Sequence, residues 1–120
     1  MKKVLIVEDE GSVLEILTEF FSLLGFSVRE ARDGEEALLA LQEGPYTLFV
    51  LDVRLPKMDG FTLAEKIREQ EPKTPIIFLT GLINEGTRER AQKIPHAYYL
   101  RKPVTFEELQ KTLTTVGVFG

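Results

Sequence analysis

Three short runs of apolar residues punctuate the chain, and no polar residue interrupts them: Val4–Val7, Leu48–Leu51 and Ile76–Leu79. Continuous apolar runs of this length are typical of strands that are buried on both faces of a parallel sheet. Two further segments, Phe26–Ala31 and Ala97–Leu100, are less uniformly apolar. We predict that they also form strands, nearer the edges of the same sheet.

Longer amphipathic segments follow these runs. They predict five helices: Ser12–Leu24, Glu35–Gln42, Phe61–Gln70, Glu85–Lys93 and Phe106–Thr115. Three begin with a short polar residue followed three positions later by Glu, the pattern of a capped helix start: Ser12 with Glu15, Asp33 with Glu36, and Thr105 with Glu108. Gly25, Gly44 and Pro72 mark helix ends.

The order of these elements is a strand followed by a helix, five times over. This order predicts an α/β fold with an open, doubly wound, five-stranded parallel sheet. The 120 residues contain no internal repeat and no linker. We therefore expect a single domain over residues 1–120.

The composition excludes several classes of protein. Hydrophobic residues make up 43% of the chain and the net charge is -4, so a globule with a core is expected and direct nucleic-acid binding is not. The absence of cysteine excludes thiolate metal sites and disulfides. The apolar run after Lys2 and Lys3 ends at Glu8, too early for a signal peptide or a membrane span. We expect a cytoplasmic location and no membrane contact.

Ligands of open α/β sheets bind beyond the carboxyl ends of the strands. The residues directly after the apolar runs are therefore the candidates for a functional site: Glu8 and Asp9, Asp52, Thr80 with Gly81, and Lys102. Together they supply three carboxylates, a hydroxyl and an ammonium group.

Three neighbouring carboxylates repel one another unless a cation balances them. Mg²⁺ prefers oxygen ligands and keeps several waters, which leaves room for a phosphate. We expect Asp9, Asp52 and the backbone carbonyl of Arg54 to hold it, with Glu8 binding directly or through water.

Asp52 then becomes a candidate nucleophile that accepts a phosphoryl group as an acyl phosphate. Phosphoryl transfer mainly requires positioning and charge neutralisation, which Mg²⁺, Lys102 and the backbone N–H groups near Thr80 can supply. The Thr80 hydroxyl can also bond the transferred group, which makes it a candidate switch residue.

Each of these residues has an ordinary structural explanation. An Asp after a strand is often a turn residue, and Glu8, Asp9 and Glu10 can serve only as negative charge near a helix start. The complete set at neighbouring strand ends favours the functional interpretation. Tyr99, in the predicted fifth strand, can likewise be a plain core or surface aromatic residue.

Four segments resemble the CheY-like receiver domains of two-component response regulators, over essentially the whole chain. They are Lys3–Glu10, Leu51–Gly60, Leu79–Gly81 and Tyr99–Pro103. The resemblance implies a flavodoxin-like topology with strand order 2-1-3-4-5. It also implies that a histidine kinase or phosphotransfer domain donates the phosphoryl group to Asp52, and that Thr80 and Tyr99 move together as a switch.

The resemblance further implies self-phosphorylation and self-dephosphorylation only, so the chain is not expected to be an enzyme for an external metabolite. A downstream effector domain, or a homodimer through the face of the fourth helix, fifth strand and fifth helix, is the implied output. The Lys102–Pro103 peptide bond is expected to be cis. Leu14, at the border of the first helix's apolar stripe, is a predicted contact for the phosphotransfer domain.

Two features depart from a routine receiver. Ile94, Pro95 and His96 replace a turn that commonly contains glycine, and Arg54 and Leu82 lie where side chains reach the path of an attacking water.

The fourth helix is weakly anchored, since only Ala91 is apolar and Gly86 is a poor helix former. We predict that this helix moves when Asp52 is phosphorylated.

Other functions fit the sequence less well. A flavodoxin-like electron carrier needs a hydroxyl- and glycine-rich loop after the first strand, where Glu8, Asp9 and Glu10 would repel the flavin phosphate. A dinucleotide enzyme needs a G-x-G-x-x-G motif there, and the sequence has none at that place. A pseudo-receiver that binds partners without phosphorylation stays open.

Overall fold

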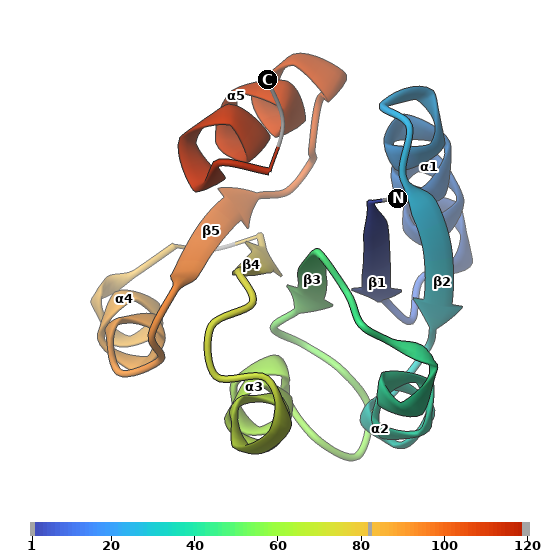
Figure 1. Ribbon diagram of the computed structural model, residues 1–120. Coiled ribbons are helices and arrows are strands. Elements are labelled where there is room, and N and C mark those ends of the chain that lie inside the picture. The colour runs from blue at the N-terminus through green and yellow to red at the C-terminus, as the bar shows by residue number, and fades with distance from the viewer. Residues whose placement is uncertain (1, 82, 119–120) are drawn as a thin grey trace.

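The computed structural model describes residues 2–81 and 83–118. Its centre is a five-stranded parallel sheet in the order β2-β1-β3-β4-β5, as predicted (Figure 1). The strands are β1 (Lys3–Val7), β2 (Ser27–Ala31), β3 (Leu48–Asp52), β4 (Ile76–Thr80) and β5 (Ala97–Arg101). The strand order reverses between β1 and β3, which places the expected ligand position at their carboxyl ends.

Helices cover both faces of the sheet (Figure 1). They are α1 (Gly11–Leu23), α2 (Gly34–Ala40), α3 (Gly60–Gln70), α4 (Glu85–Gln92) and α5 (Phe106–Val116), with a short 3-10 helix at Leu41–Glu43. The buried residues of α1 and α5 pack against one face, and those of α2, α3 and α4 pack against the other. In the described part of the chain, no helix is long and apolar enough to cross a membrane.

The two faces are built by alternation along the central strands. In β1, Leu5 and Val7 belong to the core under α2 and α3, whereas Val4 and Ile6 belong to the core under α1 and α5. All four side chains are fully buried. This explains why the central strands read as uninterrupted apolar runs, and why the edge strands β2 and β5, which are more exposed, do not.

The helix starts confirm two of the three predicted caps. The side chains of Asp33 and Thr105 accept hydrogen bonds from the backbone N–H groups of Glu36 and Glu108. The prediction for Ser12 was wrong, because α1 begins one residue earlier, at Gly11. Glu10 occupies the cap position there, and its side chain makes no capping bond.

Leu14 was also misplaced. Its side chain is only 2% exposed and lies in the core with Leu17 and Phe21, so it offers no surface to a partner. Of the neighbouring residues Phe20 and Phe21, Phe21 is the more deeply buried. The centroid of its ring lies 5.1 Å from that of the Phe26 ring. Phe20 instead packs against Phe106 of α5.

One arginine stabilises the turn between α4 and β5. Arg68, near the end of α3, donates to the carbonyls of Pro95 and His96, and also to those of Glu71 and Thr74. His96 has a positive φ of 56°, a backbone conformation that residues other than glycine rarely adopt. The Arg68 guanidinium therefore secures the turn that the sequence builds without glycine.

Candidate functional site

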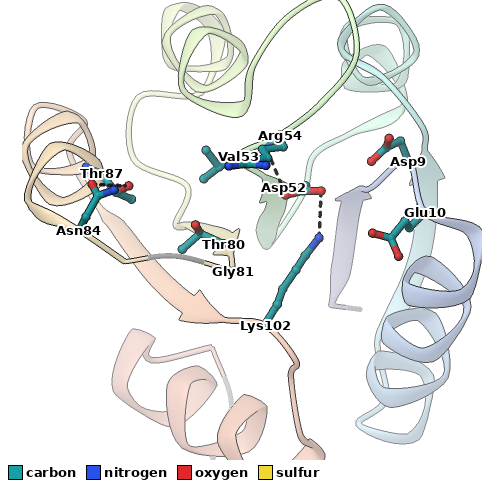
Figure 2. A pocket seen from close by; sticks show the side chains of 10 residues that line it. All are labelled: Asp9, Glu10, Asp52, Val53, Arg54, Thr80, Gly81, Asn84, Thr87 and Lys102. Atoms are coloured by element: carbon teal, nitrogen blue, oxygen red, sulfur yellow. Dashed lines mark hydrogen bonds and ion pairs between the residues drawn. The ribbon is translucent and has the colours of Figure 1, made fainter.

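The carboxyl ends of the central strands surround a cleft of about 620 Å³ (Figure 2). It lies at the edge of the sheet where the topology predicts a ligand site. The lining residues come from the last residues of β3 and β4, from the loops after β1, β3, β4 and β5, and from the start of α4: Asp9, Glu10, Asp52, Val53, Arg54, Thr80, Gly81, Asn84, Thr87 and Lys102.

Lys102 connects the two buried carboxylates. Its Nζ lies 3.0 Å from Oδ2 of Asp52 and 2.8 Å from Oε1 of Glu8. Figure 2 shows the lysine side chain extending from the loop after β5 towards Asp52 at the end of β3. The backbone N–H of Lys102 donates to the carbonyl of Thr80 at 2.8 Å, which fixes the root of the side chain. The expected cation is therefore in place beside the predicted phosphoryl acceptor.

Glu8 has no exposed surface. Burial raises its pKa to about 7, although the Lys102 ammonium and the backbone N–H of Glu10 lower it in part. The N–H of Glu10 donates to Oε2 at 3.1 Å. Oε1 makes a close ion pair with Lys102 but no hydrogen bond of acceptable geometry. This buried oxygen thus keeps unused capacity to accept.

The acidic residues fit a hard dication. Glu8, Asp9 and Asp52 each offer one carboxylate oxygen, and these three oxygens lie within 4.8 Å of one another. Carboxylate oxygens are ligands of the type that Mg²⁺ prefers. The incompletely bonded Oε1 of Glu8 is consistent with a further positive charge nearby. Asp9 is exposed, which leaves the solvent side of the cluster accessible to an ion with its waters.

The loop after Asp52 is anchored to the carboxylate itself. The backbone N–H of Arg54 donates to Oδ1 of Asp52 at 3.1 Å, so both oxygens of this carboxylate have a donor. Asp52 is only 5% exposed. Arg54 lies on the wall of the cleft, where its backbone carbonyl was expected to serve as a metal ligand. Leu82, the other predicted neighbour of the water path, is outside the described residues.

Of the two predicted switch residues, Thr80 lines the cleft and Tyr99 does not. Thr80 ends β4, is 7% exposed and lines the cleft (Figure 2). Tyr99 packs with the core under α4, and its hydroxyl donates to the carbonyl of Arg88 at 3.4 Å. Tyr99 therefore contacts α4 and not the cleft.

Two polar residues of the cleft, Asn84 and Thr87, were missed by the sequence analysis. Asn84 caps α4, and its Oδ1 accepts from the backbone N–H of Thr87 at 2.9 Å (Figure 2). The pattern of Asn followed three residues later by Thr, just before the weak fourth helix, was the available signal. Both residues place the start of α4 on the wall of the site.

Other details agree with the sequence-based interpretation. Asp59, in the loop that resembles the receiver family, caps α3 by accepting from the N–H of Thr62 at 2.8 Å. The Lys102–Pro103 peptide bond is cis. His96 is exposed in the turn before β5, as expected for a loop residue.

This fold and this edge of the sheet define a class: flavodoxin-like α/β domains that carry an acidic cluster and a lysine where an open sheet binds its ligand. The family model for the response regulator receiver domain matches residues 4–114. The chain belongs to this family and is a receiver domain of a two-component response regulator.

Curated relatives include a probable transcriptional regulator, ycf27, of Porphyridium aerugineum, which is 35% identical over 96% of this chain. The alkaline phosphatase synthesis transcriptional regulatory protein PhoP of Bacillus subtilis (strain 168) is 33% identical over the same share. The chain spans 48% of each relative, about half of their length.

Solved structures support the same assignment. The chemotaxis protein CheY4 of Vibrio cholerae is 32% identical, with a TM-score of 0.92 over 97% of this chain and 98% of that chain. A two-component response regulator from Clostridium difficile is 28% identical, with a TM-score of 0.90 over 97% of this chain and 95% of that one.

Proposed function

We propose that this domain accepts a phosphoryl group on Asp52 from a phosphohistidine of a histidine kinase or phosphotransfer domain, in a Mg²⁺-dependent reaction. The observation that carries the proposal is the placement of Lys102 Nζ, 3.0 Å from Asp52 Oδ2, beside a cluster of three carboxylates. A cation and an acidic metal-binding cluster around one nearly buried carboxylate are the groups that phosphoryl transfer requires.

The transfer forms one bond and breaks another. An oxygen of the Asp52 carboxylate attacks the phosphorus, an O–P bond forms, and the P–N bond of the phosphohistidine breaks. The electron pair of that bond stays on the imidazole, which leaves in neutral form once its ring carries a proton. Water later cleaves the acyl phosphate and returns the carboxylate and phosphate. The domain therefore acts on itself and not on a metabolite.

The residues of the cleft have separate parts in this reaction. Mg²⁺, held by Asp9, Asp52 and the Arg54 carbonyl, would neutralise charge on the transferring group. Lys102 pairs with Asp52 and is placed to bond a phosphoryl oxygen. Glu8 pairs with Lys102 and accepts from Glu10, but its Oε1 can still accept a hydrogen bond from a metal-bound water. We therefore assign it contact with the metal through water.

The state of Asp52 is then passed to a partner. We propose that the Thr80 hydroxyl bonds the phosphoryl group, and that Tyr99 follows through its contact with α4. The face of α4, β5 and α5 would reach an effector domain or a second receiver. Since the curated relatives are twice as long and are named transcriptional regulators, DNA contact would belong to another part of a longer cytoplasmic protein.

Phosphoryl uptake can be measured directly. The domain is incubated with Mg²⁺ and phosphoramidate, a small P–N phosphodonor, and its intact mass is recorded. We expect the addition of one phosphoryl group, which requires Mg²⁺ and is absent in Asp52→Asn.

A matched control comes from α2. Asp33→Asn removes one carboxylate but keeps a side chain able to cap the helix, and we expect it to gain the group as the wild type does. Phosphorylation of Asp52→Asn would show that the site is assigned to the wrong residue. No uptake by the wild type would favour a pseudo-receiver that binds its partner without phosphorylation.

A further inference from the structure

Gly60, the first residue of α3, lies against the backbone of Asp52. A Cβ atom at this position would be 2.3 Å from the carbonyl oxygen of Asp52 and 3.0 Å from the Cα of Val53. Real Cβ atoms essentially never approach another atom more closely than 3.0 Å. The helix and the end of β3 can therefore be this close only because residue 60 has no side chain.

The start of α3 is fixed in this position by further contacts. The N–H of Gly60 donates to the carbonyl of Val53 at 2.9 Å. Phe61, the next residue, is 4% exposed, and its ring lies 4.7 Å from that of Phe78 in β4. If the helix moved away from Asp52, it would lose this packing. It cannot move closer, because Gly60 already lies against the backbone of Asp52.

Two other helices also begin with glycine, and neither has this restriction. At Gly11 of α1, the nearest atom to an added Cβ is the end of the Arg32 side chain, at 4.0 Å. At Gly34 of α2, the added atom would meet the flexible side chain of Met58. Among these three glycines, only Gly60 is pressed against backbone, and that backbone belongs to the proposed phosphoryl acceptor.

We propose that Gly60 is a positioning residue for Asp52. The absence of its side chain sets the place of the strand end, and with it the Asp52 carboxylate and the carbonyl of Arg54, two residues further on. Mg²⁺ demands nearly ideal octahedral geometry, and a misplacement of about 1 Å can slow a reaction about a hundredfold. This inference rests on the proposed function of the same site.

The test is Gly60→Ala, with two measurements. Titration calorimetry gives the Kd for Mg²⁺, and intact mass gives the rate of phosphoryl uptake from phosphoramidate at saturating Mg²⁺. We expect the Kd to rise roughly tenfold and the rate to fall between about tenfold and a hundredfold. Gly11→Ala, also at the first residue of a helix, should match the wild type in both.

A second control separates positioning from stability. Ile67→Val removes a buried methyl group from α3, away from the cleft, and lowers the Tm without touching Asp52. The inference is overturned if Gly60→Ala has the Kd for Mg²⁺ and the uptake rate of the wild type. It is also overturned if the losses in Kd and rate, divided by the fall in Tm, are no larger for Gly60→Ala than for Ile67→Val. If the wild type itself neither binds Mg²⁺ nor takes up phosphoryl, the proposed function fails and this inference falls with it.

Should Gly60→Ala not fold, the wild-type domain decides the matter by NMR. The Gly60 amide should exchange slowly with solvent, because it is bonded to Val53, and its resonance should shift when Mg²⁺ is added. Fast exchange, or a resonance that Mg²⁺ leaves unchanged, would overturn the inference.

Discussion

The ammonium group of Lys102 lies 2.8 Å from Oε1 of Glu8, although the two residues follow β5 and β1, which are not neighbours in the sheet. The lysine spans the ends of β4 and β3 to make this contact. Because Glu8 is fully buried, Lys102 balances a charge that water cannot reach. The same lysine pairs with Asp52, the proposed phosphoryl acceptor. Both the stability of the domain and the proposed phosphoryl transfer would therefore depend on one cation.

Lys102→Met should destabilise the Mg²⁺-free domain. Without Lys102, the buried Glu8 carboxylate loses the cation that lowers its pKa and must either stay uncompensated or take up a proton in the folded state. We expect the free energy of unfolding to fall by about 3 kcal/mol at pH 8. Urea unfolding followed by circular dichroism measures this change. Lys111→Met, which breaks only the exposed pair with Glu107, should have little effect.

A double variant tests the cause of that loss. Lys102→Met combined with Glu8→Gln removes both charges, and we expect it to recover much of the stability while phosphoryl uptake stays lost. If Lys102→Met unfolds at the wild-type urea concentration, the Glu8–Lys102 pair does not contribute to stability as the geometry indicates.

Mg²⁺ should raise the Tm of the wild type, since a ligand that binds only the folded state stabilises it, by about 2.7 kcal/mol at a hundred times its Kd. Asp9→Asn should abolish most of this rise, with little change in the Mg²⁺-free Tm, because Asp9 is exposed. Glu10→Gln removes the same charge one residue away and should keep the response. Equal losses in the two variants would mean that net charge, not ligation, produces the effect.

Asp59 gives a prediction for acid pH. Burial would raise its pKa, but the N–H and hydroxyl of Thr62 and the Arg90 guanidinium outweigh this and hold the pKa below its ordinary value of 3.8. A lowered pKa in the folded state means that the carboxylate stabilises the domain above about pH 4, and that this stabilisation is lost as the pH falls through the lowered pKa.

Asp59→Ala should therefore lower the free energy of unfolding by about 1 kcal/mol at pH 7, as expected for the loss of a helix cap. The difference from the wild type should shrink at pH 2 to 3, measured by urea unfolding at both pH values. Asp59→Asn keeps a capping oxygen and should retain most of the stability at pH 7. A deficit of Asp59→Ala that does not change with pH would contradict the role of the charge.

Helix α4 should exchange its amide hydrogens faster than α3 or α5. Ala91 is its one buried residue in the described structure, and few buried apolar contacts permit local opening. Phosphorylation of Asp52 should alter this exchange, measured by mass spectrometry, whereas Asp52→Asn treated alike should show no change.

Gly86→Ala should slow exchange in α4, since Ala favours a helix by about 1 kcal/mol. Equal protection of all helices in both states would refute a mobile α4.

Much of the fold could be predicted because the sequence pattern and the packing agree. The uninterrupted apolar runs correspond to β1, β3 and β4, which lie at the centre of the sheet. The start of α1 was misjudged because serine is a common capping residue, so Ser12 was taken as the cap. In the structure the helix already begins at Gly11. Local pattern does not reveal where tertiary packing starts a helix.

The site could be predicted in outline but not in its contacts. The topology brings Asp9, Asp52, Thr80 and Lys102 to one cleft, as their places at strand ends indicated. That Lys102 pairs with Glu8 as well as with Asp52 depends on the reach of a side chain across two strands. The demand for glycine at position 60 likewise depends on a distance between helix and strand, which no spacing in the sequence records.

The bonds from Arg68 to the carbonyls of Pro95 and His96 link two positions that lie far apart in the sequence. In evolutionary terms, we expect that these positions do not vary independently. A relative with glycine at position 96 can adopt the positive φ without help and can replace the arginine. A relative with a larger residue there needs a donor at position 68, so the two positions should covary among receiver domains.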